Sequence, residues 1–586
     1  MNNFDDFFST LAISRVCSLN DVINFLVRER LKLTKKRKQS PSKQSTKNNA
    51  ESVPLISRIT PPRRHWNLFR PNRGMRKDLS RSEIHAKCLA VCIRNRLLYA
   101  TIQEYQWIKD LCKTVQILDD QFNAGKTMEF PRLIPIEKPV DSTNPGPKRY
   151  RVIAVQENFI DRMLHSLVAR YLQKRFRNTF SENVYGLNSS KSASKAVGNL
   201  IAYRKEFLGK TLWTSEVDIR QFFDTVSHSK IRSSLSRHIR KHFGDEQSVD
   251  PAAIQVLLNF MDQYSHCKVE AILYERVGVS SLMTEDLKGQ LREINGKYGF
   301  GIPQGSPFSN LIANVLMSEA DEAVEGVIAG ATGTGFYARF VDDVIMVHHQ
   351  KDICNRMYAA YLKSLESLNL FGHPPDQKIS THPREYLDQK TLQPYPWCHP
   401  TESQEAHRWV AFLGYHIRED LQVRLRQSTF EKELEKQCSI IEEILNKLNR
   451  PSFVENRRMR ELQNPGTLSL AFIAQKRLAA RTVGLDFIQG KFHLDQRICW
   501  NAAFPHLKGN MQGSAQLRQL DKNREKQIRK LRARLKEVDL SVSWPEWYKT
   551  CRFFGHPFSY YSLVQNNEKA SHPKLHIDRF FFDTAY

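Results

Sequence analysis

The sequence of 586 residues predicts an α+β fold, because strand-forming runs and amphipathic helical patterns occur together along one chain. A strongly β-forming run at residues 337–347 is interrupted by Asp342 and Asp343, which predicts a hairpin with both carboxylates in its turn. A second predicted strand ends at Asp218. Between these two strands, the loop at 301–310 runs directly into an apolar helical pattern.

The three aspartates predict a shared site if their two strands are neighbours in one sheet. Asp218, Asp342 and Asp343 would then meet and repel one another unless divalent cations lay between them, which is the arrangement used for two-metal phosphoryl transfer. An isolated pair of aspartates in a turn is more commonly a solvated hairpin tip, because Asp tolerates turn geometry. The loop between the two strands is the feature that favours the site.

That loop contains Gln304 and Gly305 in the sequence Gly-Ile-Pro-Gln-Gly-Ser-Pro-Phe-Ser-Asn. Glycine lets the backbone approach a ligand closely, and the start of the following helix offers unpaired N–H groups to phosphate or sugar oxygens. The loop is therefore predicted to contact a phosphate-bearing ligand.

In this order and spacing, the aspartate strand, the Pro-Gln-Gly loop and the Asp-Asp pair resemble the palm of the reverse transcriptase family. Residues 149–155, followed by Asp161 and Arg162, resemble the fingers segment of group II intron and related bacterial enzymes, and 184–187 resemble the block after it. Lys378 lies where the family has a lysine near the triphosphate. A further segment resembles the hairpin that grips the primer end in this family: Phe412, Leu413, Gly414 and Tyr415.

The resemblance covers about residues 135–420 and implies a right-hand polymerase fold. Its fingers and palm would consist of an antiparallel sheet with helices, followed by a helical thumb and flanked by helical N- and C-terminal extensions. The expected divisions are an N-terminal segment with a basic flexible linker (1–52), a helical N-terminal extension (53–135), fingers and palm (136–420), thumb (421–511) and a basic C-terminal region (512–586).

The activity implied by the resemblance is that of an RNA-directed DNA polymerase. Asp218 and Asp342 would bridge two Mg²⁺ ions, with Mn²⁺ as a substitute, and Asp343 would make a weaker or supporting contact. The resemblance also places Ile219 among the metal-binding positions. Magnesium fits because carboxylate and phosphate oxygens are hard ligands.

Several residues are expected to bind the incoming nucleotide. Arg151, with Lys148 and Lys378, would neutralise the triphosphate, although each could equally be surface charge. Gln304 and Gly305 would lie beside the sugar and base. Phe223 would lie under the 2′ position of the sugar, provided that the chain turns after Asp218; otherwise it is a core aromatic residue.

Charge and composition agree with a nucleic-acid partner. The chain has 88 Lys and Arg against 62 Asp and Glu, a net charge of +26, which favours polyanions. The expected partners are an RNA template, a DNA product and dNTPs, and an associated non-coding RNA or partner protein is compatible with the sequence. We find no bilayer-spanning run and no secretory signal, and ten cysteines without a Cys-x-x-Cys pair favour a cytoplasmic location.

Helices are predicted on both sides of the palm. Three helices are predicted from apolar residues that recur on one face. The first, near the N-terminus, has Leu19, Val22, Ile23, Leu26 and Val27, and the second has Ile84, Cys88, Val91, Cys92 and Leu97. The third has Leu434, Cys438, Ile441, Leu445 and Leu448 and ends before Pro451. Residues 34–52 are basic and have almost nothing to bury, which predicts a flexible linker.

A basic amphipathic helix is predicted at residues 518–536. Its polar side includes Arg529, Lys530, Arg532 and Arg534, with only Asp521 and Glu525 as opposing charges. Such a surface can follow a phosphate backbone, or it can simply be a solvated helix face.

Alternatives remain within and beyond the family. Phe340 and Val341 stand where many members have Tyr-Ala, and the chain most resembles stand-alone enzymes associated with antiphage defence. One rival is a group II intron-type maturase, a structured-RNA-binding protein with secondary polymerase activity. Another is an RNA-dependent RNA polymerase, but such enzymes usually have Gly-Asp-Asp where this chain has Val-Asp-Asp.

Overall fold

The computed structural model describes most of the central part of the chain and parts of both ends. The described residues are 4–39, 54–61, 81–94, 106–127, 129–137, 150–186, 191–244, 248–264, 275, 285–295, 299–373, 391–403, 406–464, 467–483, 506–507, 510–544 and 558–559.

Runs of helices and mainly antiparallel strands occur together along the chain, and the predicted α+β class is confirmed. The described strands are Arg132–Glu137 (β1), Tyr150–Val155 (β2), Val184–Tyr185 (β3), Leu212–Val217 (β4), Phe336–Phe340 (β5), Asp343–His348 (β6), Leu392–Trp397 (β7), Trp409–Phe412 (β8), Tyr415–Arg418 (β9) and Val423–Leu425 (β10). The described helices are Phe4–Ser9 (α1), Ala12–Arg15 (η1, a 3₁₀ helix), Leu19–Gln39 (α2), Leu55–Arg58 (α3), Arg81–Arg94 (α6), Gln106–Ala124 (α7), Phe159–Phe176 (α8), Ala193–Glu206 (α9), Phe222–Thr225 (α10), His228–Phe243 (α11), Pro251–Gln263 (α12), Glu285–Asn295 (α14), Ser309–Ala329 (α15), Lys351–Ser367 (α16), Gln427–Leu448 (α17), Pro451–Gln463 (α18), Leu470–Val483 (α19) and Met511–Glu537 (α21).

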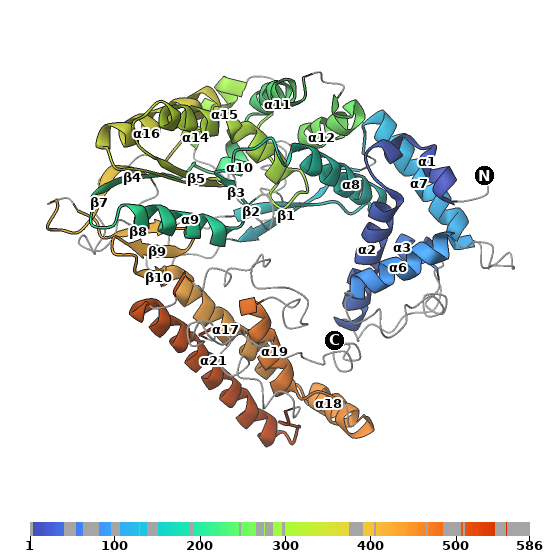
Figure 1. The fold of residues 1–586 in the computed structure, drawn as a ribbon. Coiled ribbons are helices and arrows are strands. Elements are labelled where there is room, and N and C mark those ends of the chain that lie inside the picture. Colours follow the sequence, from blue (N-terminus) through green and yellow to red (C-terminus); the bar gives the residue numbers. More distant parts are fainter. Residues whose placement is uncertain are drawn as a thin grey trace.

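A five-stranded sheet with the order β3-β5-β6-β4-β7 forms the centre of the larger body, and we call it the palm sheet. Strand β3 runs parallel to β5, and the other neighbours are antiparallel. Figure 1 shows α15 and α16 on one face of this sheet and α9 on the other.

Side chains alternate between the two faces of the palm sheet, as a strand requires. Tyr337 and Met346 belong to the core that includes α15 and α16. Ala338 and Ile345 belong to a second core, which includes residues of the small sheet β10-β9-β8 and the first turns of α21. The palm sheet therefore separates two hydrophobic cores.

The N-terminal helices pack against α8 beside the palm (Figure 1). Glu29 of α2 forms an ion pair with Arg162 of α8 at 3.0 Å, and Asp21 pairs with Arg170 at the same distance. The backbone N–H of Ile13 donates to the buried carboxylate of Asp119 at 2.7 Å. These contacts attach the N-terminal segment to the fingers side of the molecule.

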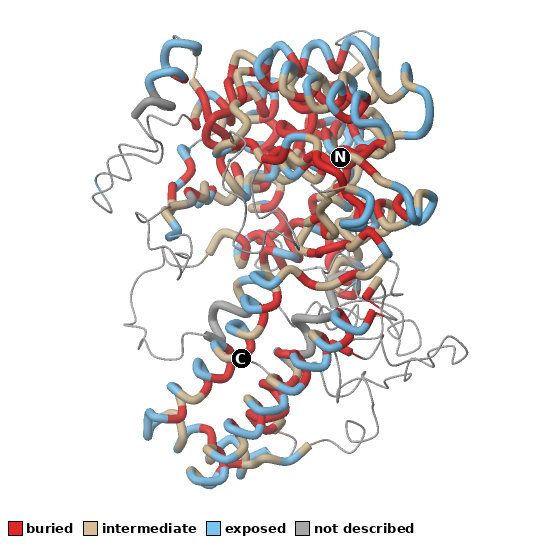
Figure 2. The backbone as a smooth tube through the Cα atoms, turned by 90° about the vertical axis from the view of Figure 1, so that its left-hand side faces the viewer, coloured by how far each residue is buried: buried red, intermediate tan, exposed pale blue. Residues whose placement is uncertain are grey.

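A smaller helical body follows the palm and is formed by α17, α18, α19 and α21 (Figure 1). Its core contains Ile441 and Ile444 of α17 together with Leu531 and Leu535 of α21. Figure 2 shows the buried residues of these helices on the sides that face one another. Helix α21 begins before the expected boundary at residue 512 and packs on α17, so the predicted thumb and C-terminal region share this core.

The helical predictions are confirmed in outline and corrected in detail. All five apolar residues predicted for the first helix are buried in α2, but α2 continues to Gln39, so residues 34–39 of the predicted linker are helical. The rest of that linker lies outside the described residues. Cys88 and Cys92 lie in the core on one face of α6, and Leu97 lies outside the described residues.

The buried face of α17 differs from the prediction. Ile441 and Leu448 are buried as expected, but Leu434, Cys438 and Leu445 are only half-buried. Polar residues take the central positions instead: Gln437 is fully buried and accepts a hydrogen bond from Asn523 of α21 at 2.8 Å. An apolar pattern misplaces the face because it omits such paired polar residues. Pro451 follows the end of α17 and is the first residue of α18.

Within the described residues, none of the helices combines the length and the apolar character that crossing a membrane requires.

Candidate active site

The Asp-Asp pair lies at a tight hairpin between β5 and β6, as predicted. Phe340 pairs with Asp343, which leaves Val341 and Asp342 as a two-residue turn. Asp342 is therefore in the turn, whereas Asp343 is the first residue of β6, a small correction to the prediction that both carboxylates lie in the turn. Val341 has φ of 61°, in the left-handed region. This conformation costs an L-residue about 1 to 2 kcal/mol, and a β-branched residue adopts it rarely.

Asp218 is brought to the same end of the palm sheet by the pairing of β4 with β6. Val217, the last residue of β4, pairs with Val344 of β6. Asp218 follows Val217 and Asp343 precedes Val344, so in an antiparallel pair the two aspartates lie at corresponding positions. The prediction that the two aspartate strands are neighbours in one sheet is confirmed.

The charges of the three aspartates act on one another. The side chain of Asp343 reaches solvent, but burial by the surrounding protein, together with the charges of Asp342 and Asp218, raises its pKa to about 6. The charges of Asp342 and Asp218 thus disfavour the ionised form of Asp343. A nearby divalent cation would reverse this effect.

Asp218 also contacts a short segment after α16. Its carbonyl accepts a hydrogen bond from the backbone N–H of His373 at 2.9 Å, and its carboxylate lies 3.8 Å from the His373 ring. Ile219 is buried and forms an isolated antiparallel bridge with Gly372. This pairing fixes the direction of the chain directly after Asp218.

The donor set suits a hard divalent ion. Asp218, Asp342 and Asp343 offer carboxylate oxygens, and their mutual repulsion is the signature of a site that a cation would stabilise. Among the described residues, however, no three His, Cys, Asp or Glu side chains are already arranged as a metal-binding group. Oxygens of a bound substrate would therefore have to complete the coordination.

The chain turns sharply after Asp218, as the prediction for Phe223 requires. Gln221 has φ of 48°, and the short helix α10 begins at Phe222. Phe222 is buried in the core, whereas Phe223 is only partly buried and packs on the edge of the same core. The backbone N–H of Ile302 donates to the carbonyl of Phe223 at 2.7 Å, which joins this turn to the Pro-Gln-Gly loop.

The Pro-Gln-Gly loop lies beside the fingers strand β2. Gln304 forms a parallel bridge with Ile153, and Gly305 is exposed with φ of 82°. Helix α15 begins directly afterwards, at Ser309. Arg151 belongs to β2, two residues before Ile153, but its side chain is outside the described residues. Lys148 and Lys378 also lie outside the described residues.

The hairpin predicted to grip the primer is present between β8 and β9. Phe412 pairs with Tyr415, and Leu413 and Gly414 form its turn with φ of 47° and 85°. Phe412 and Tyr415 are buried in the second core, so the turn residues are the ones at the surface. The carbonyl of Gly414 accepts a hydrogen bond from Arg426, which anchors the hairpin to the start of α17.

The predicted basic helix lies within α21. Its apolar side is buried and consists of Leu517, Leu520, Ile528, Leu531 and Leu535. Arg529 and Lys530 are exposed, whereas Arg532 lies over the Trp544 ring at 5.5 Å and Arg534 pairs with Glu537 at 2.8 Å. Two charged residues of this helix are buried: Arg524 donates to Gln475, and Asp521, expected on the polar side, accepts from Ser559.

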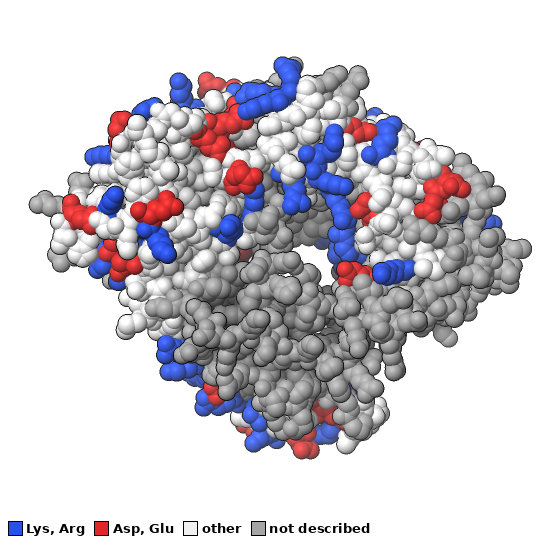
Figure 3. Space-filling model, in the orientation of Figure 1, with Lys and Arg blue, Asp and Glu red and all other residues white. Residues whose placement is uncertain are grey.

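On the face of the molecule that Figure 3 shows, the described Lys and Arg side chains are distributed unevenly. In this view they gather along the upper right border of a central opening. On the smaller body they follow the outer edge along α21, away from that opening. Nucleic acid bound to α21 would therefore run along the outside of the helical body.

Two groups of residues near the aspartates were missed in the sequence. Burial raises the pKa of Glu216, two residues before Asp218, to about 8, and Tyr395 donates a hydrogen bond to its carboxylate at 2.9 Å. Arg339, within the strand before the Asp-Asp pair, is fully buried and ion-paired with Asp321. The one signal in the sequence is an arginine inside an otherwise apolar strand.

Comparison with known proteins agrees with this geometry. Residues 136–417 match the family model described as reverse transcriptase (RNA-dependent DNA polymerase). A curated relative, the "Putative COX1/OXI3 intron 1 protein" of Saccharomyces cerevisiae, is 23% identical over 212 residues. That match covers 36% of this chain and only 20% of the relative.

Solved telomerase structures also resemble the chain loosely. Apo telomerase from Candida tropicalis gives a TM-score of 0.33 with 10% identity, covering 87% of this chain and 77% of that one. Telomerase from Candida albicans in complex with a TWJ fragment of telomeric RNA gives 0.31 with 11% identity, covering 87% and 84%.

The family match spans both aspartate strands, the Pro-Gln-Gly loop and the hairpin between β8 and β9. The segment of this chain from residue 136 to residue 417 belongs to the reverse transcriptase family.

Proposed function

We propose that this protein is an RNA-directed DNA polymerase that adds deoxynucleotides to a primer 3′ hydroxyl by two-metal phosphoryl transfer. The observation that carries the proposal is the register of β4 and β6, which sets Asp218 beside Asp343 at the end of the palm sheet that also carries Asp342. Burial, together with the charges of Asp342 and Asp218, raises the pKa of Asp343 there. Membership of the reverse transcriptase family supports the same reaction.

In this proposal the three aspartates hold two Mg²⁺ ions, for which Mn²⁺ could substitute. Bound there, the ions would lower the pKa of the primer hydroxyl and neutralise charge on the triphosphate and the leaving pyrophosphate. Asp218 and Asp342 would contact both ions, and Asp343 would support them.

The chain's own residues would orient the nucleotide. Gln304 and Gly305 lie next to β2, so a nucleotide over this loop would also be within reach of that strand, which carries Arg151. Phe223 is joined to the same loop through the hydrogen bond from Ile302 and would pack against the sugar. Lys148 and Lys378 are proposed triphosphate contacts from the sequence. Leu413 and Gly414 would support the primer end through their backbone.

The test is template-directed synthesis by the purified full-length chain. A primed RNA template and a primed DNA template of the same sequence are each offered with dNTPs, with Mg²⁺ or with a chelator. We expect Mg²⁺-dependent extension on RNA. A protein with intact fold that extends neither primer would contradict the proposal, and extension only with ribonucleotides would favour an RNA-dependent RNA polymerase.

A second candidate is an intron-type maturase, in which binding to a structured RNA is the main task. The observation that favours it is the similarity to a yeast protein named for an intron. Sequencing the RNA that copurifies with the protein from its host separates the two. A single structured RNA, held equally well by Asp342→Asn, would favour the maturase, whereas diverse templates with matching DNA would favour the polymerase.

A role in bacterial antiphage defence rests on the sequence resemblance alone. Its test is the survival of the host under phage challenge with the parent gene and with Asp342→Asn. Equal survival would contradict a defence role that depends on synthesis.

A further inference from the structure

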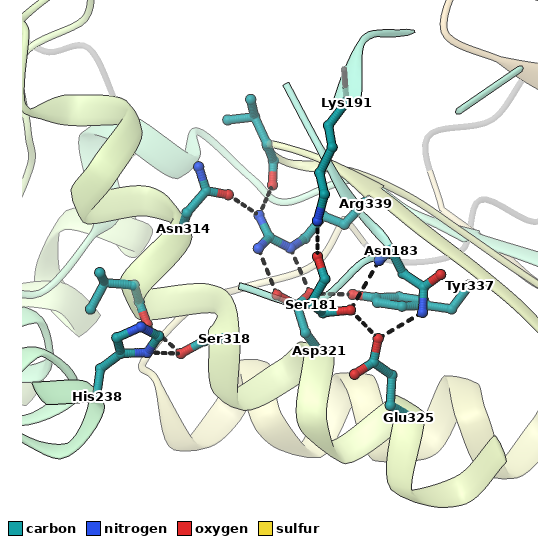
Figure 4. A network of polar contacts seen from close by, with 12 residues as sticks. Ser181, Asn183, Lys191, His238, Asn314, Ser318, Asp321, Glu325, Tyr337 and Arg339 are labelled. Atoms are coloured by element: carbon teal, nitrogen blue, oxygen red, sulfur yellow. Dashed lines mark hydrogen bonds and ion pairs between the residues drawn. The ribbon is translucent and has the colours of Figure 1, made fainter. Parts of the chain in front are cut away.

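The guanidinium of Arg339 occupies the fully buried space between β5 and α15 (Figure 4). It forms a two-pronged ion pair with Asp321, with Nε to Oδ1 at 2.7 Å and Nη2 to Oδ2 at 2.6 Å. Tyr337, two residues earlier on the same strand face, donates its hydroxyl to the same carboxylate at 2.6 Å. Asp321 thereby fixes the guanidinium in one orientation.

The third nitrogen of this guanidinium, Nη1, points toward the hairpin between β5 and β6. Nη1 donates to the carbonyl oxygen of Val341 at 2.9 Å and to Oδ1 of Asn314 at 3.0 Å. Val341 is the residue with φ of 61°, and Asp342 follows it. The charged hydrogen bond therefore ends on the peptide group that connects the strained residue to the first aspartate of the pair.

The same network continues toward two other motifs around the site. Asn314 donates to the carbonyl of Asn310 at 2.8 Å, and Asn310 lies at the first turn of α15, directly after the Pro-Gln-Gly loop. Asn310 in turn donates to the carbonyl of Gly186 at 3.4 Å. Gly186 directly follows β3, and β3 pairs in parallel with β5.

A buried ion pair is weak evidence for stability, because desolvation offsets much of its Coulomb energy. Here the guanidinium also satisfies a carbonyl in a left-handed turn, a conformation that persists only when the surrounding structure enforces it. The contacts of Arg339 therefore stabilise a particular backbone conformation at Val341 in addition to filling the core.

We propose that Arg339 is a positioning residue for catalysis, which holds the Val341 peptide in its left-handed conformation and so fixes Asp342 relative to Asp218 and the Pro-Gln-Gly loop. Arg339 itself touches neither nucleotide nor metal. This inference rests on the proposed polymerase function for its kinetic consequence, but its structural consequence can be measured separately.

The first variant is Arg339→Lys. Lysine keeps a positive charge beside Asp321, but a single ammonium cannot reproduce the planar fork that reaches Asp321, Asn314 and Val341 together. The matched control is Arg204→Lys, because Arg204 is also buried and donates to backbone carbonyls, at Glu419, Lys210 and Trp397. None of its hydrogen bonds to described residues reaches the turn of Val341 and Asp342.

Hydrogen exchange of the intact proteins, without metal or substrate, is the direct measurement. Peptides that cover residues 337–346 should exchange faster in Arg339→Lys than in the parent and should be unchanged in Arg204→Lys. Unchanged exchange of this hairpin in Arg339→Lys would overturn the proposal, whether or not the protein is a polymerase.

The kinetic measurement is the rate of single-nucleotide addition per folded molecule, with the folded fraction determined for each protein. Arg339→Lys should lose up to about a hundredfold, the scale expected when a reacting group is displaced by about 1 Å. Arg204→Lys should keep the parental rate per folded molecule. A loss in Arg339→Lys that its folded fraction fully explains would show a purely structural role.

A second-site change tests the turn itself. Glycine adopts φ of 61° without strain, so Val341→Gly added to Arg339→Lys should recover part of the lost rate. No recovery would contradict the role of the Val341 peptide. If the parent shows no incorporation at all, the proposed function fails while the exchange experiment still decides the positioning role.

Discussion

Val217 and Val344 are paired across β4 and β6, and this register sets Asp218 and Asp343 at the same end of the palm sheet. Two segments far apart in the sequence thereby bring their acidic groups together. The repulsion between these groups lowers the stability of the protein in the absence of cations, because the folded chain brings together charges that the unfolded chain keeps apart.

Relief of this repulsion should be measurable. We predict that Asp343→Asn, in the presence of a chelator at pH 8, is at least as stable toward urea as the parent, because the carboxylate that the other two disfavour is removed. Asp352→Asn, which removes an exposed acid from the first turn of α16, is the control and should lower the unfolding free energy by no more than about 0.3 to 1 kcal/mol, the contribution of an acid near a helix N-terminus. If Asp343→Asn were clearly less stable than the parent while the control was not, other groups of the protein would have to stabilise the charged Asp343 carboxylate.

A buried histidine should make the fold sensitive to acid. His165 of α8 packs edge-on against Phe260 and Phe308, and burial lowers its pKa to about 4, below the 6.5 of an exposed imidazole. The stability that depends on its neutral form is complete above pH 6.5 and is lost as the pH falls toward 4. Between pH 7.5 and pH 5 the parent should lose about 2 kcal/mol from this group.

The measurement is urea unfolding of the parent and of His165→Phe at both pH values. The variant keeps an aromatic ring between the two phenylalanines but cannot bind a proton, so its loss should be smaller by that amount. Parallel losses in the two proteins would show that other groups cause the acid sensitivity.

Phe223 should select the sugar of the incoming nucleotide. It is partly exposed at the turn after Asp218, while Phe222 beside it is buried. If its ring fills the space that a 2′ hydroxyl requires, Phe223→Val should admit ribonucleotides with only a modest loss of deoxynucleotide incorporation. Primer extension with each nucleotide type measures the selectivity, and Phe222→Leu is the packing control. Equal selectivity in the parent and Phe223→Val would make Phe223 a core residue.

The basic face of α21 should contribute to RNA binding only if nucleic acid runs along the outer edge of the helical body. Replacement of Arg529, Lys530, Arg532 and Arg534 by Gln should then weaken binding for all sequences and flatten the salt dependence by about 0.7 to 0.9 log unit per lost phosphate contact. Arg532 lies over Trp544 and Arg534 pairs with Glu537. Arg529 pairs with Glu525, but its side chain is more exposed than that of Arg534, so Arg529 and Lys530 should account for most of the effect.

The control for α21 replaces Arg356 and Lys363 by Gln. Both residues are exposed on α16, which covers the face of the palm sheet opposite to the face covered by α9. These changes remove charge without touching the helical body. If the α21 variant and the α16 control have the same slope of log affinity against log salt as the parent, α21 is a solvated helix face.

The palm could be predicted from sequence because its signals are local. The β-forming run around Asp342, the strand ending at Asp218 and the Gly/Pro loop before α15 each follow from the residues within them. The partners of buried polar groups could not be predicted, because they come from distant segments. Gln437 on α17 is buried because Asn523 pairs with it, which shifts the buried face of that helix.

Arg339 shows the same limit inside the site. An arginine in a strand is ordinarily placed at the surface, and only α15, which begins at Ser309, supplies the carboxylate that keeps it buried. The left-handed conformation of Val341 is equally invisible in the sequence, because a valine predicts extended backbone there.

The most direct test of the proposed function is the rate of Mg²⁺-dependent deoxynucleotide addition on a primed RNA template by Asp342→Asn, compared with the parent and with Asp352→Asn as the control. Asn keeps the size of the side chain and removes its charge. The account predicts that Asp342→Asn is folded, binds the primed template and adds no nucleotide, while the control adds nucleotides at the parental rate. Addition by Asp342→Asn at anything near the parental rate would contradict it.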